Sequence, residues 1–219
     1  MKKIILLLGL SLVSLGALSF DELIYKDEVK PSFDCSKVKD DGKSDDELMI
    51  CNEIGVRNEF ENKKLALVDN IYSSLYQNIS KKADKKTKKD FKAISKKADK
   101  KTKKDFKAIS KKMIKERKIC IKNMQNTKAG ENPILPLLNA SDCMQEAYAK
   151  ALLELTQRAK KDIKTKEVLE QIFKNKVDKY ENLLTQSLNT NKDLQDFIDS
   201  LAKEDLIDSR AKFKLWNLN

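Results

Sequence analysis

The chain has 219 residues, of which 40% are hydrophobic and 36% are charged, so it can bury the core of one helical domain but is too short for a barrel enzyme. Its 5 glycines and 3 prolines are too few for an all-β sandwich or a glycine-looped nucleotide fold. It contains no histidine, which excludes Ser-His-Asp and Cys-His catalysis and histidine-bearing zinc sites. We therefore expect a basic, all-α protein with no catalytic residue, no metal site and no cofactor.

The first nineteen residues have the pattern of a signal peptide. Lys2 and Lys3 give a charged start, and residues 4–18 form an apolar stretch that is too short to span a membrane. Small residues precede Phe20, where we expect cleavage. Cleavage would leave a periplasmic or secreted chain without a membrane span, in which residues 20–31 form a short N-terminal segment. The alternative is an N-terminal membrane anchor that is kept.

Four cysteines follow the predicted signal peptide: Cys35, Cys51, Cys120 and Cys143. None lies in a C-x-x-C pair, and without histidine a zinc site at such wide spacings is not expected. Disulfides are the simplest interpretation for an exported chain. Of the three connectivities, the sequential one closes the shortest loops, each of which would stabilise the fold by roughly 3 kcal/mol. The cysteine spacing by itself leaves the choice open.

Helix signals organise the first half of the chain. Residues 44–47 read S-D-D-E, a capping box that predicts a helix start. Apolar residues recur every three or four positions over 65–79, which predicts a helix with one buried face. A second helix is expected to end near Cys120. Residues 127–141 contain one glycine and two prolines, and they predict a loop that carries exposed apolar side chains.

The second half repeats the helical pattern. Asp142 is expected to cap a helix whose apolar stripe reaches Leu155. A further stripe over 169–188 predicts one more helix, and a break is expected at 187–192. Aromatic and aliphatic residues at 213–216 predict a packed cluster near the C-terminus.

A tandem repeat lies within the first half. Residues 79–93 read ISKKADKKTKKDFKA, residues 94–108 repeat them without a change, and 109–112 begin a third copy. Fifteen residues are close to four helical turns, so the second copy would extend a helix by about 22 Å and keep the same face toward the core. The alternative is a frayed, solvated hairpin tip.

The net positive charge is concentrated in the repeat and the few residues that follow it. Residues 80–118 contain nineteen Lys or Arg against five Asp or Glu, while the rest of the chain beyond the predicted signal peptide is mildly acidic. This polybasic segment could bind anionic lipid, lipopolysaccharide or wall polymer, or it could be a solvated helix face. Nucleic acid is not an expected partner, because few aromatic residues are interleaved. The candidate lysines are Lys81, Lys82, Lys85, Lys86, Lys96, Lys97, Lys100 and Lys101.

An ordered set of short motifs accompanies the cysteines. It comprises F-D-C at 33–35, E-L-M-I-C at 47–51, L-x-x-V-D-x-x-Y-x-x-x-Y at 65–76, M-I-K-E-R-K-I-C at 113–120 and C-M-x-x-x-Y at 143–148. In this order the motifs resemble the lysozyme-inhibitor LprI-like family of small exported helical domains. Three features depart from the family pattern, one of which is the lysine repeat, because it lengthens the central hairpin. Met113 stands where the family has tryptophan, and the leucine–aspartate motif lies further beyond Cys51 than usual.

The resemblance implies an architecture. It implies the sequential disulfides, and a helical hairpin or bundle over residues 32–156 with the lysine-rich repeat inserted at 79–112. Residues 157–219 would then be a C-terminal helical extension. The expected fold is therefore an all-α, disulfide-stapled bundle with long helices.

The resemblance also implies a function, which is non-catalytic binding to lysozyme or another cell-wall hydrolase. We expect the contacts to come from the hairpin and the predicted loop, and the candidate residues are Arg117, Ile134, Leu135, Leu137 and Leu138. The alternative is an envelope interaction or structural module tethered by the polybasic segment. An enzyme is the least favoured class, because no isolated pair of carboxylates stands in an apolar setting.

Overall fold

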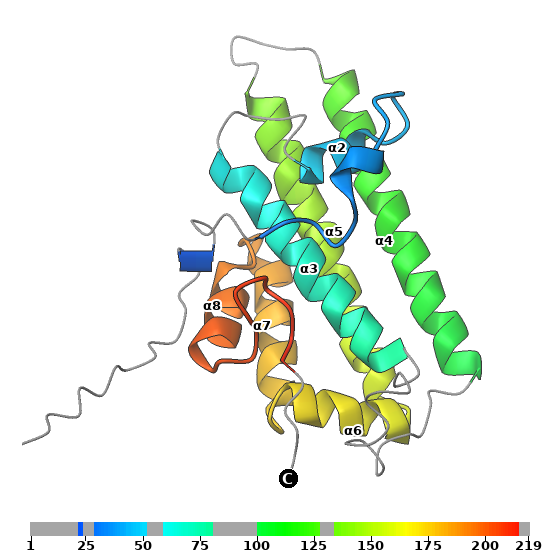
Figure 1. The fold of residues 1–219 in the computed structure, drawn as a ribbon, viewed down its shortest axis with the longest axis vertical. Coiled ribbons are helices and arrows are strands. Elements are labelled where there is room, and N and C mark those ends of the chain that lie inside the picture. Colours follow the sequence, from blue (N-terminus) through cyan, green and yellow to red (C-terminus); the bar gives the residue numbers. More distant parts are fainter. Residues whose placement is uncertain (1–21, 24–28, 52–58, 81–99, 128–133, 215–219) are drawn as a thin grey trace, which may run out of the picture.

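The computed structural model describes residues 22–23, 29–51, 59–80, 100–127 and 134–214, so the predicted signal peptide lies outside the described residues (Figure 1). The described part is helical, and its only β-type pairing is an isolated bridge between Ile207 and Phe213. The prediction of an all-α fold is confirmed. The elements are η1 (Cys35–Lys37), α2 (Asp45–Ile50), α3 (Glu59–Ser80), α4 (Lys100–Asn126), α5 (Leu135–Lys160), α6 (Ile163–Ile172), α7 (Val177–Thr190) and α8 (Gln195–Lys203).

Helix α5 is the centre of the bundle. It packs against α4 and α3 on one side and against α6 and α7 on the other, while α2 covers the end where α4 finishes and α5 begins (Figure 1). The predicted stripe of α3 is buried, with Leu65, Leu75 and Ile79 at most 3% exposed. One hydrophobic core joins these helices.

The two disulfides have the sequential pairing that the resemblance implies. Cys35 is bonded to Cys51, which closes the loop that leads into α2, and Cys120 is bonded to Cys143, which links α4 to α5. Helix α2 begins where the capping box predicts, because the carbonyl of Ser44 accepts the amides of Glu47 and Leu48 at 2.9 Å. The Ser44 hydroxyl makes no cap bond. Two disulfides indicate a non-reducing, extracytoplasmic environment.

The predicted loop at 127–141 is wrong over its second half. Helix α5 begins at Leu135, seven residues before the predicted cap, and Asp142 lies inside the helix. Pro136 does not prevent this start, because it occupies the first turn, where no backbone amide is needed as a donor. Helix α4 likewise continues to Asn126, past the end expected near Cys120.

The single helix predicted over 169–188 is also wrong. Helices α6 and α7 are separated by a turn in which Lys174 and Asn175 have φ of 48° and 62°. The break predicted at 187–192 is correct, since α7 ends at Thr190 and Asn191 adopts φ of 48°. No glycine or proline follows Pro136, so these turns use non-glycine residues in the left-handed region, which sequence patterns signal poorly.

The second copy of the repeat is not a solvated segment. Helix α4 begins within it at Lys100, and Thr102 and Phe106 are fully buried. Phe106 belongs to the same core as α3 and α5. The helical interpretation of the repeat is therefore correct for its last nine residues, and residues 81–99 lie outside the described part.

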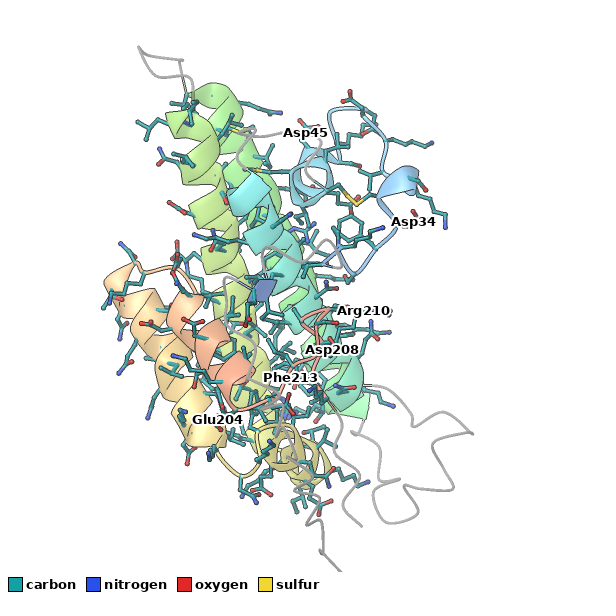
Figure 2. All side chains as sticks on the ribbon, turned by 60° about the vertical axis from the view of Figure 1, so that its left-hand side comes forward. Asp34, Asp45, Glu204, Asp208, Arg210 and Phe213 are labelled. Carbon is teal, nitrogen blue, oxygen red and sulfur yellow. A yellow bond between two sulfur atoms is a disulfide. The ribbon has the colours of Figure 1, made fainter. Side chains whose placement is uncertain are left out.

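The C-terminal helices share the core of the disulfide-linked helices. The amide of Phe213 donates to the Ser74 hydroxyl of α3 at 3.0 Å, and its ring lies 5.3 Å from that of Phe173 (Figure 2). The predicted terminal cluster is thus correct for Phe213, while Leu215 and Trp216 lie outside the described residues. In the described part of the chain, no helix is both long enough and apolar enough to cross a bilayer.

Candidate functional site

Residues from three of the motifs that carry the resemblance, together with Asp46 and Ser32, meet in one buried polar network. Arg117 of α4 donates to the Asp46 carboxylate through Nε at 3.1 Å and Nη2 at 2.6 Å, and through Nη1 to the Tyr148 hydroxyl at 2.7 Å. Tyr148 of α5 in turn donates to Asp69 of α3 at 2.7 Å. The other oxygen of Asp69 accepts the amide of Ser32 at 2.7 Å. The network therefore ties α2, α3, α4, α5 and the N-terminal segment together.

Burial is the main cause of the shifted pKa values of the tyrosines in and beside this network. It raises the pKa of the Tyr148 hydroxyl, and it raises the pKa of nearby Tyr72 to about 12. Burial alone would lower the pKa of Arg117, but the facing Tyr148 and Asp46 raise it above its ordinary value. With both pKa values raised, the Arg117 guanidinium stays charged and the Tyr148 hydroxyl stays neutral at neutral pH.

The network is inaccessible to a partner protein. Arg117 is 4% exposed and Tyr148 is not exposed at all. The prediction that Arg117 contacts a partner is wrong, because its guanidinium is buried and donates to Asp46 Oδ2 inside the core. The motif residues Asp69, Arg117 and Tyr148 therefore hold the fold together, and a binding surface has to come from other residues.

The other candidate contact residues lie at the start of α5. Ile134 is 45% exposed and Leu135 is 53% exposed, whereas Leu137 and Leu138 are half-buried. The prediction of exposed apolar residues holds for the first two. Helix α5 begins at Leu135 and is bonded to α4 through Cys143, so Leu135 stands on the first turn of a helix and Ile134 is its N-cap residue.

A polar groove adjoins this apolar pair. Its volume is about 520 Å³, and it lies between the first turns of α5 and the connection from α7 to α8. Two of its carboxylates have cationic neighbours, since Glu146 pairs with Lys150 at 2.6 Å and Asp193 with Lys64 at 3.1 Å. The lining residues are Asn139, Asp142, Cys143, Gln145, Glu146, Ala149, Ser187, Leu188, Asn191, Lys192, Asp193 and Leu194.

One exposed face of α5 joins the apolar pair to the groove. Leu135, Asn139, Asp142 and Glu146 are all exposed, and their spacing of four, three and four residues places them in one row along the helix. We call these four residues the α5 row. It presents an apolar side chain first, then an amide, then two carboxylates, so it can contact an apolar patch with a cationic rim.

The candidate lysines are only partly described. Lys100 opens α4 and Lys101 is exposed on it, while Lys81, Lys82, Lys85, Lys86, Lys96 and Lys97 lie outside the described residues. Exposed lysines that the sequence analysis did not single out follow on the same helix. Six of them lie in one row, and we call these six the basic face of α4: Lys104, Lys107, Lys111, Lys115, Lys118 and Lys122.

Comparisons with known proteins add no relative. No family model, no curated protein and no solved structure matches the chain. Among the described residues there is also no cluster of three or more cysteine, aspartate or glutamate side chains with metal-binding geometry.

The sequence analysis missed the α5 row and the basic face of α4. The row needed the start of α5 at Leu135, which the proline and the predicted loop concealed. The three-to-four spacing of the lysines was present in the sequence. Because lysine is so frequent in this region, the sequence did not show which lysines share one exposed helix face.

Proposed function

We propose that this protein is an exported, non-catalytic binding protein that contacts a lysozyme-type cell-wall hydrolase through the α5 row. The row supports this proposal because it combines an exposed leucine with two exposed carboxylates beside a groove of about 520 Å³. Protein interfaces typically have an apolar anchor within a polar rim. Lysozymes of the common animal type are basic, so carboxylates in the rim favour their approach.

The basic face of α4 lies away from the proposed contact surface. A large positive charge would slow the encounter with a basic enzyme if it lay beside the contact surface. The groove lies between α5 and the end of α7, whereas α4 runs along the edge of the bundle away from α7 and α8 (Figure 1). The enzyme would therefore meet the carboxylates of the α5 row and not the basic face.

The proposal also includes the compartment. The signal-peptide pattern of residues 1–19 and the two disulfides both favour a periplasmic or secreted protein. Wall hydrolases act in the same compartments. The motif resemblance supports the same class of partner.

The test is inhibition of wall lysis by lysozyme, with binding measured by calorimetry. Leu135→Ser should weaken binding at least tenfold, because a central apolar anchor contributes more than about 1 kcal/mol. Ile163→Ser is the matched control, since Ile163 is 79% exposed on α6, away from the row, and should bind as the wild type does.

Charge is tested separately. Asp142→Asn with Glu146→Gln should lower the association rate at low salt more than at high salt. Glu167→Gln with Asp196→Asn removes two exposed carboxylates from α6 and α8 as the control. If the wild-type protein neither inhibits nor binds the enzyme at concentrations far above that of the enzyme, the proposed function is wrong.

A further inference from the structure

We propose that the basic face of α4 docks the protein flat on an anionic lipid bilayer. Its six lysines recur at steps of three, four, four, three and four residues, so they form one straight row. From Lys104 to Lys122 the row spans roughly 27 Å of helix. All six side chains are exposed, and among the described residues none of them forms an ion pair with a carboxylate.

Helix α4 itself adds no fully exposed carboxylate to this row. Helix α4 contains two carboxylates, Asp105 and Glu116, and both are half-buried. Asp105 is paired with Arg158 of α5 at 2.6 Å, and Lys112, beside the row, is held by Glu154. The exposed charged residues of α4 itself are therefore all basic, which fits a negatively charged surface. At the C-terminal end of the row, Lys118 donates to the Lys43 carbonyl at 3.1 Å, and Asp45 of α2 accepts from Gln125 at 2.6 Å.

Two exposed isoleucines indicate a bilayer rather than a dissolved polymer. Ile114 is 41% exposed and lies one turn from Lys111 and Lys118, and Ile119 is 46% exposed and lies one turn from Lys115 and Lys122. Apolar side chains between lysines can enter the headgroup region while the ammonium groups contact lipid phosphates. A dissolved polyanion offers no apolar layer for them.

The shape of the face agrees with this partner. Helix α4 is the outer edge of the bundle, and it contacts α2, α3 and α5 with its other sides (Figure 1). A straight, convex edge can touch a plane along its whole length but cannot surround a flexible chain. With α4 on the bilayer, the groove beside α7 remains open to a protein partner.

The test is cosedimentation with vesicles made of equal parts phosphatidylglycerol and phosphatidylcholine. The variant Lys104→Gln/Lys111→Gln/Lys115→Gln/Lys122→Gln should bind at least a hundredfold more weakly at low salt, since each lysine at an anionic surface contributes about a factor of five. The matched control is Lys161→Gln/Lys192→Gln/Lys203→Gln/Lys212→Gln, which removes four exposed lysines outside α4 and should lose far less. Glutamine keeps the helix propensity of lysine, and circular dichroism verifies that both variants fold.

Further arms of the experiment separate the bilayer from other partners. Ile114→Ser/Ile119→Ser should weaken vesicle binding severalfold even at high salt, and soluble polyglutamate should compete poorly. Equal binding by the two four-lysine variants would overturn the proposal. So would effective competition by polyglutamate together with no effect of the isoleucine variant, because that result would indicate a polyanion. Loss of vesicle binding leaves lysozyme inhibition intact, so the outcome is independent of the proposed function.

Discussion

The two halves of the bundle are held together by different interactions. Helices α2 to α5 are linked by two disulfides and by a buried network that contains an ion pair between Arg117 and Asp46. Helices α6 to α8 have neither, and they are fixed by stacked and edge-on aromatic rings, with Phe173 and Tyr180 centred 4.9 Å apart. Directional bonds thus link the long helices, whereas the short helices surround an aromatic cluster.

Removing the Arg117–Asp46 ion pair should have the largest effect on the stability of the first half. Arg117→Met should lower the free energy of unfolding by about 4 kcal/mol, because the Asp46 carboxylate would stay buried without its cation. Urea denaturation followed by circular dichroism measures this loss. Arg158→Met is the control, since the Arg158–Asp105 pair is partly exposed and should cost about 1 kcal/mol. Equal losses of unfolding free energy in the two variants would mean that burial does not increase the contribution of the Arg117 pair to stability.

The disulfides are the next strongest constraint. Replacing Cys120 and Cys143 together by alanine should cost about 3 kcal/mol, because the unfolded chain regains the entropy of a loop of 23 residues. Peptide mapping of the wild-type protein should find no free thiol and only the sequential bridges. Cys120→Ser should leave Cys143 free to react with a thiol reagent. A crosslink between Cys51 and Cys120 as the main species would contradict the pairing.

The second half contains an exposed ion cluster whose contribution to stability should depend on pH. Glu204 contacts Lys176 and Lys179 at the outer corner of α7 and α8, visible in Figure 2. Burial alone would raise its pKa, but the two lysines lower it from 4.5 to about 2. Its folded-state pKa is below the unfolded value, so the stabilisation is present above pH 4.5 and is lost as the pH falls toward 2.

The matched variant for this cluster is Glu204→Gln. Since the lysines are about half exposed, we expect the wild type to lose only about 1 kcal/mol of this stabilisation across that range. Melting temperatures recorded against pH should therefore converge for wild type and variant at low pH. Parallel curves would show that Glu204 does not carry the acid sensitivity.

The tandem repeat should give the smallest effect. Deleting residues 79–93 or 94–108 yields the same sequence, in which the surviving copy still supplies Ile79 to the end of α3 and Phe106 to α4. The connection between Ser80 and Lys100 shortens from nineteen residues to four, a normal length between antiparallel helices. Tyr72 of α3 meets Ser110 of α4 at 2.7 Å, and the end of α3 lies beside the start of α4 (Figure 1).

We therefore expect the deletion to leave stability unchanged or to raise it by up to about 1 kcal/mol through a smaller loop entropy. Urea denaturation measures the difference. Phe106→Ala in the full chain is the contrasting variant and should cost about 3 kcal/mol or more, because the ring is fully buried. A comparable loss on deletion would mean that both copies contribute to the core.

Part of this fold was accessible to sequence analysis because local rules set it. The all-α class followed from the scarcity of glycine and proline, and the α2 start followed from the S-D-D-E capping box. The buried stripe of α3 followed from its three-to-four spacing. By contrast, the turns at Lys174 and Asn175 use non-glycine residues in the left-handed region, and helix packing compensates for their local strain.

The candidate sites were less accessible than the fold. The sequence by itself determined which residue types are present: an apolar pair at Ile134 and Leu135, an arginine at 117 and an excess of lysine. Only the tertiary structure decided that Arg117 is buried on Asp46, that Leu135 joins a row with Asp142 and Glu146, and that six lysines share the outer face of α4. The physical reason is that charge and hydropathy are properties of single residues, whereas exposure depends on which helix faces pack together, and contacts between residues far apart in the chain set that packing.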